Sequence, residues 1–265
     1  MKRPQAIGLA LPVGLALSIA SGGCGGGSPL LHGAQVLGPG ETTFGAGASA
    51  QIAALNRVTA LEGASSSGGP SSAVRASRVL EDLGFGAGVA PWVGARIGIE
   101  GQNEAGLAYT GRSVRLDFRH AFQLGGRWAL SVGAGGSAII PRLQGEGQSD
   151  QGSAYGPGVD VPVVIGRDFA DIYSVWLGPR AGYDHLRGSL SSLLVEPGVP
   201  EESLELEGDH FWAGGLVGVK VGFRGIHVAL EVDAAWHHGQ GTLGDESASF
   251  DQVSITPAGA LIVAF

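Results

Sequence analysis

Apolar and polar residues alternate one by one along most of this chain, in runs of about 10 to 14 residues. A period of two is the spacing of a β-strand whose two faces meet different surroundings. Strands of soluble proteins average ~5 to 6 residues, whereas a tilted strand needs ~9 to 11 residues to cross a bilayer. The runs therefore favour membrane-crossing strands. In one of them the apolar face is Ile226, Val228, Leu230, Val232, Ala234 and Trp236, opposite His227, Glu231 and Asp233.

The connections between these runs also alternate, between short and long. This asymmetry is typical of outer-membrane barrels, whose periplasmic turns are short and whose extracellular loops are longer. It places both ends of the barrel on the periplasmic side. The short connections are 124–126, 170–171 and 224–225, and the long ones are 141–157, 186–208 and 239–250.

The number of strands depends on one change of phase. The apolar face is odd-numbered up to Tyr109 and even-numbered from Val114, so the phase flips at 111–113. A tight turn there gives ten strands, counting 42–54 as the first, whereas a bulge gives nine. Eight strands remain if 42–54 does not span. Because even numbers are the rule for bacterial barrels, we predict an all-β, up-and-down antiparallel transmembrane barrel of ten strands, with eight as the alternative.

Aromatic residues on the predicted outer face fall into two bands, as expected where amphipathic rings prefer the membrane interface. The band near the periplasmic boundary holds Phe44, Phe122, Trp128, Tyr173, Phe223 and Phe265. The band near the extracellular boundary holds Phe85, Tyr183, Phe211 and Trp236.

The last run ends in Leu261, Ile262, Val263, Ala264 and Phe265 and resembles the C-terminal strand by which outer-membrane barrels are recognised for assembly. The resemblance covers 42–265 and implies a small bacterial outer-membrane β-barrel. It implies outer-membrane lipids, lipopolysaccharide and the barrel-assembly machinery as partners, the last through the strand ending at Phe265. Abundant Gly and Arg with almost no Lys resemble the composition of high-GC proteobacteria, such as myxobacteria.

The first residues resemble a lipoprotein signal peptide. Lys2 and Arg3 precede an apolar run of 15 residues, 6–20, which is too short for a spanning helix. The sequence Ser21-Gly22-Gly23-Cys24 then resembles the lipobox of bacterial lipoproteins, with serine in place of the usual leucine.

This resemblance divides the chain into three parts: a signal peptide, 1–23, a Gly/Pro-rich tether lipidated at Cys24, 24–41, and the barrel, 42–265. We expect the tether to be flexible. Ordinary secretory cleavage, which would leave Cys24 a free thiol, is the alternative.

Charge and cysteine content exclude other classes. The chain has 16 basic and 24 acidic residues, a net charge of −8, so nucleic acid is not expected as a partner. A single cysteine excludes a disulfide framework. The loop 186–209 is acidic, and we expect it to bind divalent cations that bridge to lipopolysaccharide phosphates through Glu196, Glu201, Glu202, Glu205 and Glu207. The segment 56–82 carries a short helix or is disordered.

Charged residues on the predicted inner face indicate what fills the lumen. Opposite signs on neighbouring strands can pair, so we predict a lumen largely plugged by charged side chains and a structural or narrow-pore role. The inward charges are Arg96, Glu100, Arg115, Asp117, Arg119, Arg180, Asp184, Lys220, Glu231 and Asp233.

Two other functions are kept as alternatives. The pairs Asp184-His185, Asp209-His210 and His237-His238 end three successive strands at the extracellular rim and could form a metal or acid–base site. Ten-stranded omptin-like proteases have an Asp/His site at this height, but the Asp-Asp pair of that pattern and the serine–histidine context of barrel lipases are absent. We therefore predict no enzyme, cofactor or metal site. The other alternative is a soluble, periplasmic β-domain lipoprotein, although the apolar face lacks the large residues of a packed core.

Overall fold

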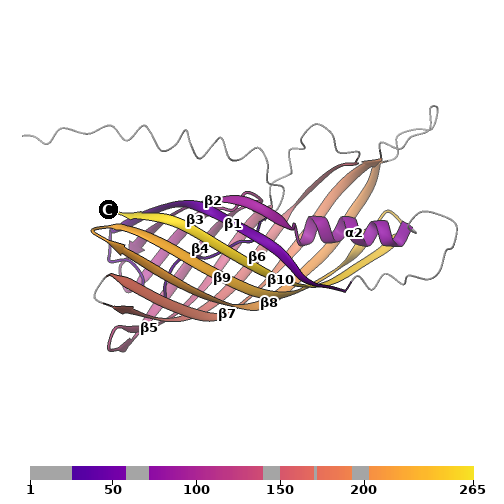
Figure 1. The fold of residues 1–265 in the computed structure, drawn as a ribbon. Helices are drawn as coiled ribbons and strands as arrows, with labels where there is room; N and C mark the ends of the chain where they lie inside the picture. The colour runs from indigo at the N-terminus through magenta and orange to yellow at the C-terminus, as the bar shows by residue number, and fades with distance from the viewer. Residues whose placement is uncertain (1–25, 58–71, 140–149, 170–171, 193–202) are drawn as a thin grey trace, which may run out of the picture.

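The alternating runs form ten strands that close into one antiparallel barrel in the computed structural model, which describes residues 26–57, 72–139, 150–169, 172–192 and 203–265 (Figure 1). Each strand pairs with its neighbours in sequence, and β1 pairs with β10 to close the ring. The elements are β1 (Thr42–Arg57), α2 (Ser72–Gly84), β2 (Gly88–Ile99), β3 (Asn103–Tyr109), β4 (Ser113–Gly125), β5 (Trp128–Ile139), β6 (Asp150–Phe169), β7 (Tyr173–Ser192), β8 (Ser203–Phe223), β9 (Ile226–Leu243) and β10 (Glu246–Ala264).

The predicted ten-stranded, up-and-down barrel is confirmed. The phase change comes from a tight turn between Tyr109 and Ser113, in which Gly111 adopts a left-handed φ of 75°. Among the residues that the structure describes, no helix is long and apolar enough to cross a membrane.

The two ends of the barrel differ. We call the end at which β1 starts and β10 finishes the termini end, and the opposite one the helix end, because α2 lies there (Figure 1). The connections at the termini end are all two or three residues long, whereas at the helix end only those between β3 and β4 and between β9 and β10 are this short. Between β8 and β9, Arg224 and Gly225 have φ values of 52° and 82°, the two left-handed residues of a hairpin turn that suits the twist of the strands.

The strands reach further at the helix end than the sequence predicted. The predicted loop 239–250 is mostly strand, because β9 runs to Leu243 and β10 begins at Glu246. The predicted loop 186–208 is likewise shortened by β7 and β8, which continue to Ser192 and start at Ser203. The alternation in both regions is carried by polar and small residues, a composition that is also typical of loops, so the sequence predicted loops there.

The helix α2 packs inside this projecting part of the wall. Its apolar side chains Ala76 and Leu80 are fully buried against Leu186, Leu206 and Phe250. Residues 72–84 therefore form the helix that was one of the two alternatives for 56–82. Phe85 belongs to this buried cluster, so its prediction as an outward aromatic is wrong. A hydrophobic pocket beneath the helix is a better environment for the ring than the interface.

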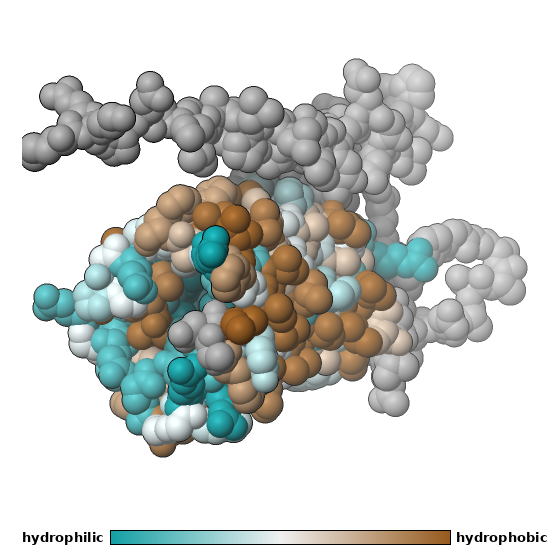
Figure 2. All heavy atoms as spheres, turned by 60° about the vertical axis from the view of Figure 1, so that its left-hand side comes forward, coloured by the Kyte–Doolittle hydropathy of each residue, from teal (hydrophilic) through white to brown (hydrophobic). Residues whose placement is uncertain are grey.

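The outer wall of the barrel is apolar, as the alternation predicted. Val217 and Leu230 are more than half exposed, whereas their neighbours Leu216 and Glu231 point inward and are buried. Hydrophobic side chains cover the wall, and hydrophilic ones gather at the termini end (Figure 2). Apart from Phe85, every aromatic residue of the two predicted bands is exposed.

A segment before the first strand lies inside the lumen. This lumenal segment, Gly26–Glu41, starts at the helix end, where the Gly26 amide donates to Gly86, and finishes at the termini end, where the Gly40 amide donates to Gly98. Between these points Leu30, Leu31 and Ala34 are at most 2% exposed and pack against Trp176. The expectation of a flexible tether is therefore wrong for 26–41. Cys24 and the signal peptide lie outside the described residues.

Candidate functional site: the lumen and its polar cavity

Buried arginines and carboxylates form a network across the lumen. The Arg115 guanidinium donates to Asp160 at 2.7 Å and also pairs with Asp117, while Arg180 donates to the other Asp160 oxygen at 2.9 Å. Because an unpaired charge at this depth costs several kcal/mol, each group holds the next in place.

The network continues toward the termini end. Glu104 pairs with Arg119 at 2.9 Å and with Arg96, which also pairs with Asp117. Glu104 was not among the predicted inward residues, although its even number places it on the face of β3 opposite to that of Leu107 and Tyr109. Glu100 was wrongly assigned to the lumen: it is exposed in the turn between β2 and β3.

The lumenal segment is bound by the same charged groups. The Glu231 carboxylate accepts hydrogen bonds from the amides of Leu30, at 2.7 Å, and Leu31, at 3.0 Å. It also accepts one from the Trp176 indole at 3.1 Å. Glu231 itself is only 2% exposed. One carboxylate therefore satisfies three buried donors and fixes the middle of the segment.

Further contacts hold the segment on both sides of this point. Arg119 donates to the carbonyl oxygens of Gly33 and, at 2.9 Å, Gln35. Glu104 accepts from the Leu37 amide at 2.9 Å, and Arg180 donates to the Ser28 carbonyl. A glycine-rich chain is slim and leaves its backbone open to such contacts, so the composition that suggested flexibility also suits a crowded, charged lumen.

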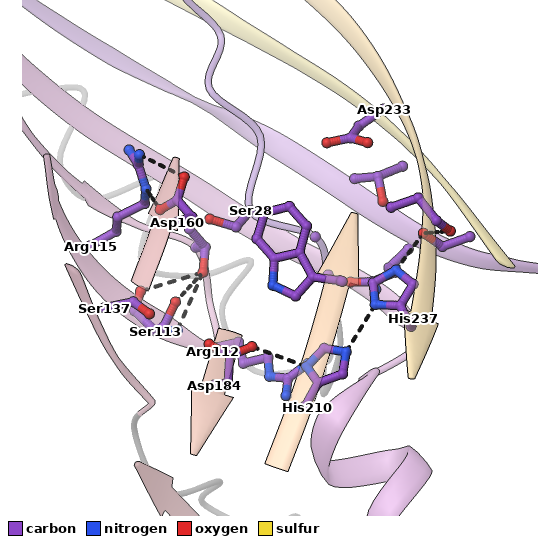
Figure 3. A pocket seen from close by; sticks show the side chains of 18 of the residues that line it. Ser28, Arg112, Ser113, Arg115, Ser137, Asp160, Asp184, His210, Asp233 and His237 are labelled. Atoms are coloured by element: carbon purple, nitrogen blue, oxygen red, sulfur yellow. Dashed lines mark hydrogen bonds and ion pairs between the residues drawn. The ribbon is translucent and has the colours of Figure 1, made fainter. Parts of the chain in front are cut away.

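A polar cavity of about 90 Å³ lies between the lumenal segment and α2 (Figure 3). It is bounded by Gly84 of α2, by the first residues of the lumenal segment and by the strand walls. The predicted inward residues Arg115, Arg180, Asp184 and Asp233 line it, together with Arg112, Asp160, His210, His237 and Ser254.

Four side chains of this cavity form a continuous hydrogen-bonded row, which we call the Ser–His–His–Asp row. Ser254 Oγ lies 2.8 Å from His237 Nε2. His237 Nδ1 lies 3.0 Å from His210 Nε2, and His210 Nδ1 lies 3.0 Å from Asp184 Oδ2 (Figure 3). The four residues come from β10, β9, β8 and β7, successive strands whose inward positions meet at one height of the barrel.

Aromatic rings fix the two histidines. Their imidazole planes are 6° from parallel and their centroids 5.2 Å apart, as expected of two rings joined edge to edge by a hydrogen bond. Phe85 meets His237 edge-on at 5.2 Å, and Phe250 lies 5.8 Å from His210. The cluster that holds α2 thus also orients the row.

The structure divides the rim residues that the sequence placed together. Asp184, His210 and His237 face the lumen. By contrast, His185 pairs with Asp209 at 2.9 Å, and His238 with Asp251 at 2.9 Å, away from this row. No group of three or more His, Cys, Asp or Glu residues in the described part of the chain is arranged to hold a metal ion. Ser254 was not considered from the sequence because it is far from His237 in the chain; its even number, shared with the polar face of β10, was the available signal.

A second cavity, of about 160 Å³, lies at the termini end. The predicted inward residue Lys220 lines it, with Asp168, Ser174 and His227. It is separate from the Ser–His–His–Asp row and shares no lining residue with the first cavity.

Comparison with known proteins assigns no function to the chain. No protein-family profile matches, and no curated protein matches. Among solved structures, Neisserial surface protein A aligns at 12% identity over 85% of this chain and 96% of its own, with a TM-score of 0.30. The attachment invasion locus protein Ail of Yersinia pestis aligns at 13% identity over 86% and 99%, with a TM-score of 0.29. The toluene transporter TbuX of Ralstonia pickettii aligns at 10% identity over 86% and 89%, with a TM-score of 0.31. None of these values is high enough to transfer a function.

Proposed function

We propose that this protein is a bacterial outer-membrane β-barrel with a structural role, whose lumen is closed by its own lumenal segment. The supporting features are the closed ring of strands and the apolar outer wall. Closure leaves no unpaired strand edge, which hydrocarbon would penalise at several kcal/mol per group. In this arrangement the outer wall contacts lipid, the termini end is periplasmic and the helix end faces outward.

The observation that carries the closed lumen is the burial of the lumenal segment. Its backbone is bound by Glu231, Arg119 and Glu104, and its leucines pack against Trp176. The docked helix α2 adds a second closure at the helix end. A narrow pore is the competing function.

Two measurements test this function. The folded barrel in detergent should migrate differently on an SDS gel before and after boiling, and a single unshifted band would refute the barrel. In a planar bilayer the purified protein should carry no steady current. A stable unitary conductance would replace the closed lumen by the narrow pore.

The lipid anchor belongs to the same proposal. Gly26 is at the helix end, and two residues span at most ~7 Å, so a lipid on Cys24 would emerge near the outward-facing mouth. Metabolic labelling with a clickable palmitate tests the modification: wild-type protein should be labelled and Cys24→Ala should not. Equal labelling of both would place the lipid elsewhere, and labelling of neither would leave ordinary secretory cleavage.

The remaining partners are proposed on similar grounds. The final strand, which ends at Phe265, would be recognised by the barrel-assembly machinery. Glu205 and Glu207 lie on the outward face of β8, while Glu196, Glu201 and Glu202 lie outside the described residues. Replacing all five glutamates should abolish calcium binding in calorimetry, and unchanged binding would defeat this part.

A further inference from the structure

The direction of the hydrogen bonds in the Ser–His–His–Asp row sets the protonation of each ring. A carboxylate only accepts, so His210 Nδ1 carries the proton that it donates to Asp184. When both imidazoles are neutral, each has one donor and one acceptor nitrogen, so His210 Nε2 accepts the Nδ1 proton of His237. The Nε2 atom of His237 is left unprotonated, at 2.8 Å from the Ser254 hydroxyl.

The Ser254 hydroxyl has its best acceptor in this histidine. The alternative acceptor, the Ala235 carbonyl, is 3.5 Å away, too far to compete. A serine hydroxyl that donates to a neutral imidazole, itself oriented by a further acceptor, is the arrangement that activates a serine for attack on a carbonyl.

The surroundings of Ser254 suit such a reaction. Its side chain is 1% exposed and lies in the wall of the cavity, so it is shielded from bulk solvent. By this measure of volume a water needs about 10–15 Å³, so about 90 Å³ admits several waters or an acyl group of acetyl size. The Arg112 side chain brings a positive charge to the same cavity.

We propose that Ser254 and His237 form a catalytic pair that hydrolyses esters of short-chain, acetyl-sized acids. Ser254 Oγ bonds to the acyl carbon and passes its proton to His237 Nε2. The same proton goes to the leaving alcohol oxygen as the ester C–O bond breaks. A water molecule then gives its proton to His237 and its hydroxyl to the acyl carbon, and the proton returns to Ser254 as the acid leaves.

In this reaction His210 and Asp184 are positioning residues, because they act through His237. Asp184 holds His210 in one tautomer, and His210 in turn holds His237 with Nε2 toward the serine. The proposal goes beyond the structural role and is independent of it, since a folded, closed barrel does not require a reactive Ser254.

The first experiment uses wild-type protein and a small serine reagent, methanesulfonyl fluoride. Attack by Ser254 forms an O–S bond and releases fluoride, and peptide mass spectrometry locates the modified residue. Ser49 is the internal control, because it is also buried in the lumen but donates to the Gly27 carbonyl, not to a histidine. General-base assistance is worth ~100- to 10,000-fold, so Ser254 should react at least ~100-fold faster than Ser49.

Variants then separate chemistry from structure. His237→Gln should lower the Ser254 reaction by ~100-fold or more while the heat-dependent gel shift persists. Asp184→Asn should slow it, and Asp184→Glu should restore part of the rate. The wild-type protein should also hydrolyse p-nitrophenyl acetate, and Ser254→Ala should abolish this activity. If Ser254 reacts no faster than Ser49 in protein that still shows the gel shift, the proposal is overturned while the barrel stands.

Discussion

Glu231 should control whether the lumenal segment stays docked, and Glu231→Ala tests this. The substitution removes the common acceptor of the Leu30 and Leu31 amides and the Trp176 indole, at 2.7, 3.0 and 3.1 Å. Hydrogen bonds to a charged group contribute about 1.5–3 kcal/mol each, so losing three costs about 4.5 kcal/mol even at the lower value. Since 1.4 kcal/mol is a tenfold change in an equilibrium constant, the undocked population should rise roughly 1000-fold.

Hydrogen–deuterium exchange followed by mass spectrometry measures this population. Peptides containing Leu30 and Leu31 should exchange much faster in Glu231→Ala, and the variant should show intermittent current in a planar bilayer. Glu231→Gln should be intermediate, because its amide oxygen still accepts. The control is Glu100→Ala, which removes an exposed carboxylate from a turn. Unchanged exchange in folded Glu231→Ala would refute the assignment of Glu231 as the anchor of the segment.

Three further outcomes test the wall, the charge network and the helix. Val217→Arg, on the outer wall, should destabilise the barrel in lipid vesicles by about 2–4 kcal/mol in urea unfolding, and an unaffected midpoint would show that this face does not meet lipid. Asp160→Asn leaves Arg115 and Arg180 without their shared carboxylate and should cost about 3–5 kcal/mol in the same assay; a loss no larger than that of exposed Asp245→Asn would contradict the network. Leu80→Ala should cost about 2–5 kcal/mol of helix docking, seen as faster trypsin cleavage after Arg78, and equal cleavage rates would mean that Leu80 does not hold the helix.

The barrel itself was predictable because the alternation is a local signal. The two faces of each strand can be recognised within a few residues. The phase change before Val114 allowed ten strands or nine, and the even-number rule for bacterial barrels selected ten. The strand ends at the helix end were not predictable in the same way. There the wall projects and packs against α2, so burial depends on a partner from elsewhere in the chain, and Phe85 changes from an interface residue to a core residue.

The charges that line the lumen were predictable from the sequence, but the presence of the lumenal segment among them was not. Parity placed Arg115 and Glu231 inside, yet nothing in the sequence of 24–41 says that its backbone meets these charges. The Ser–His–His–Asp row could be predicted only in part from the sequence. Asp184, His210 and His237 stood at matching heights, whereas Ser254 joins them only through the register of β9 and β10, which sequence periodicity does not define.

The position of the lumenal segment also limits the order in which the protein can be assembled. The segment immediately precedes β1, and the ring is closed by the seam between β1 and β10, the first and last strands to be synthesised. Feeding this segment through a finished cylinder full of arginine–carboxylate pairs would require breaking those pairs one after another. It is simpler for the sheet to curl around the lumenal segment while that segment is already in place, so that the pairing between β1 and β10 forms last. In this order of assembly, the lumenal segment is in place before the barrel closes around it.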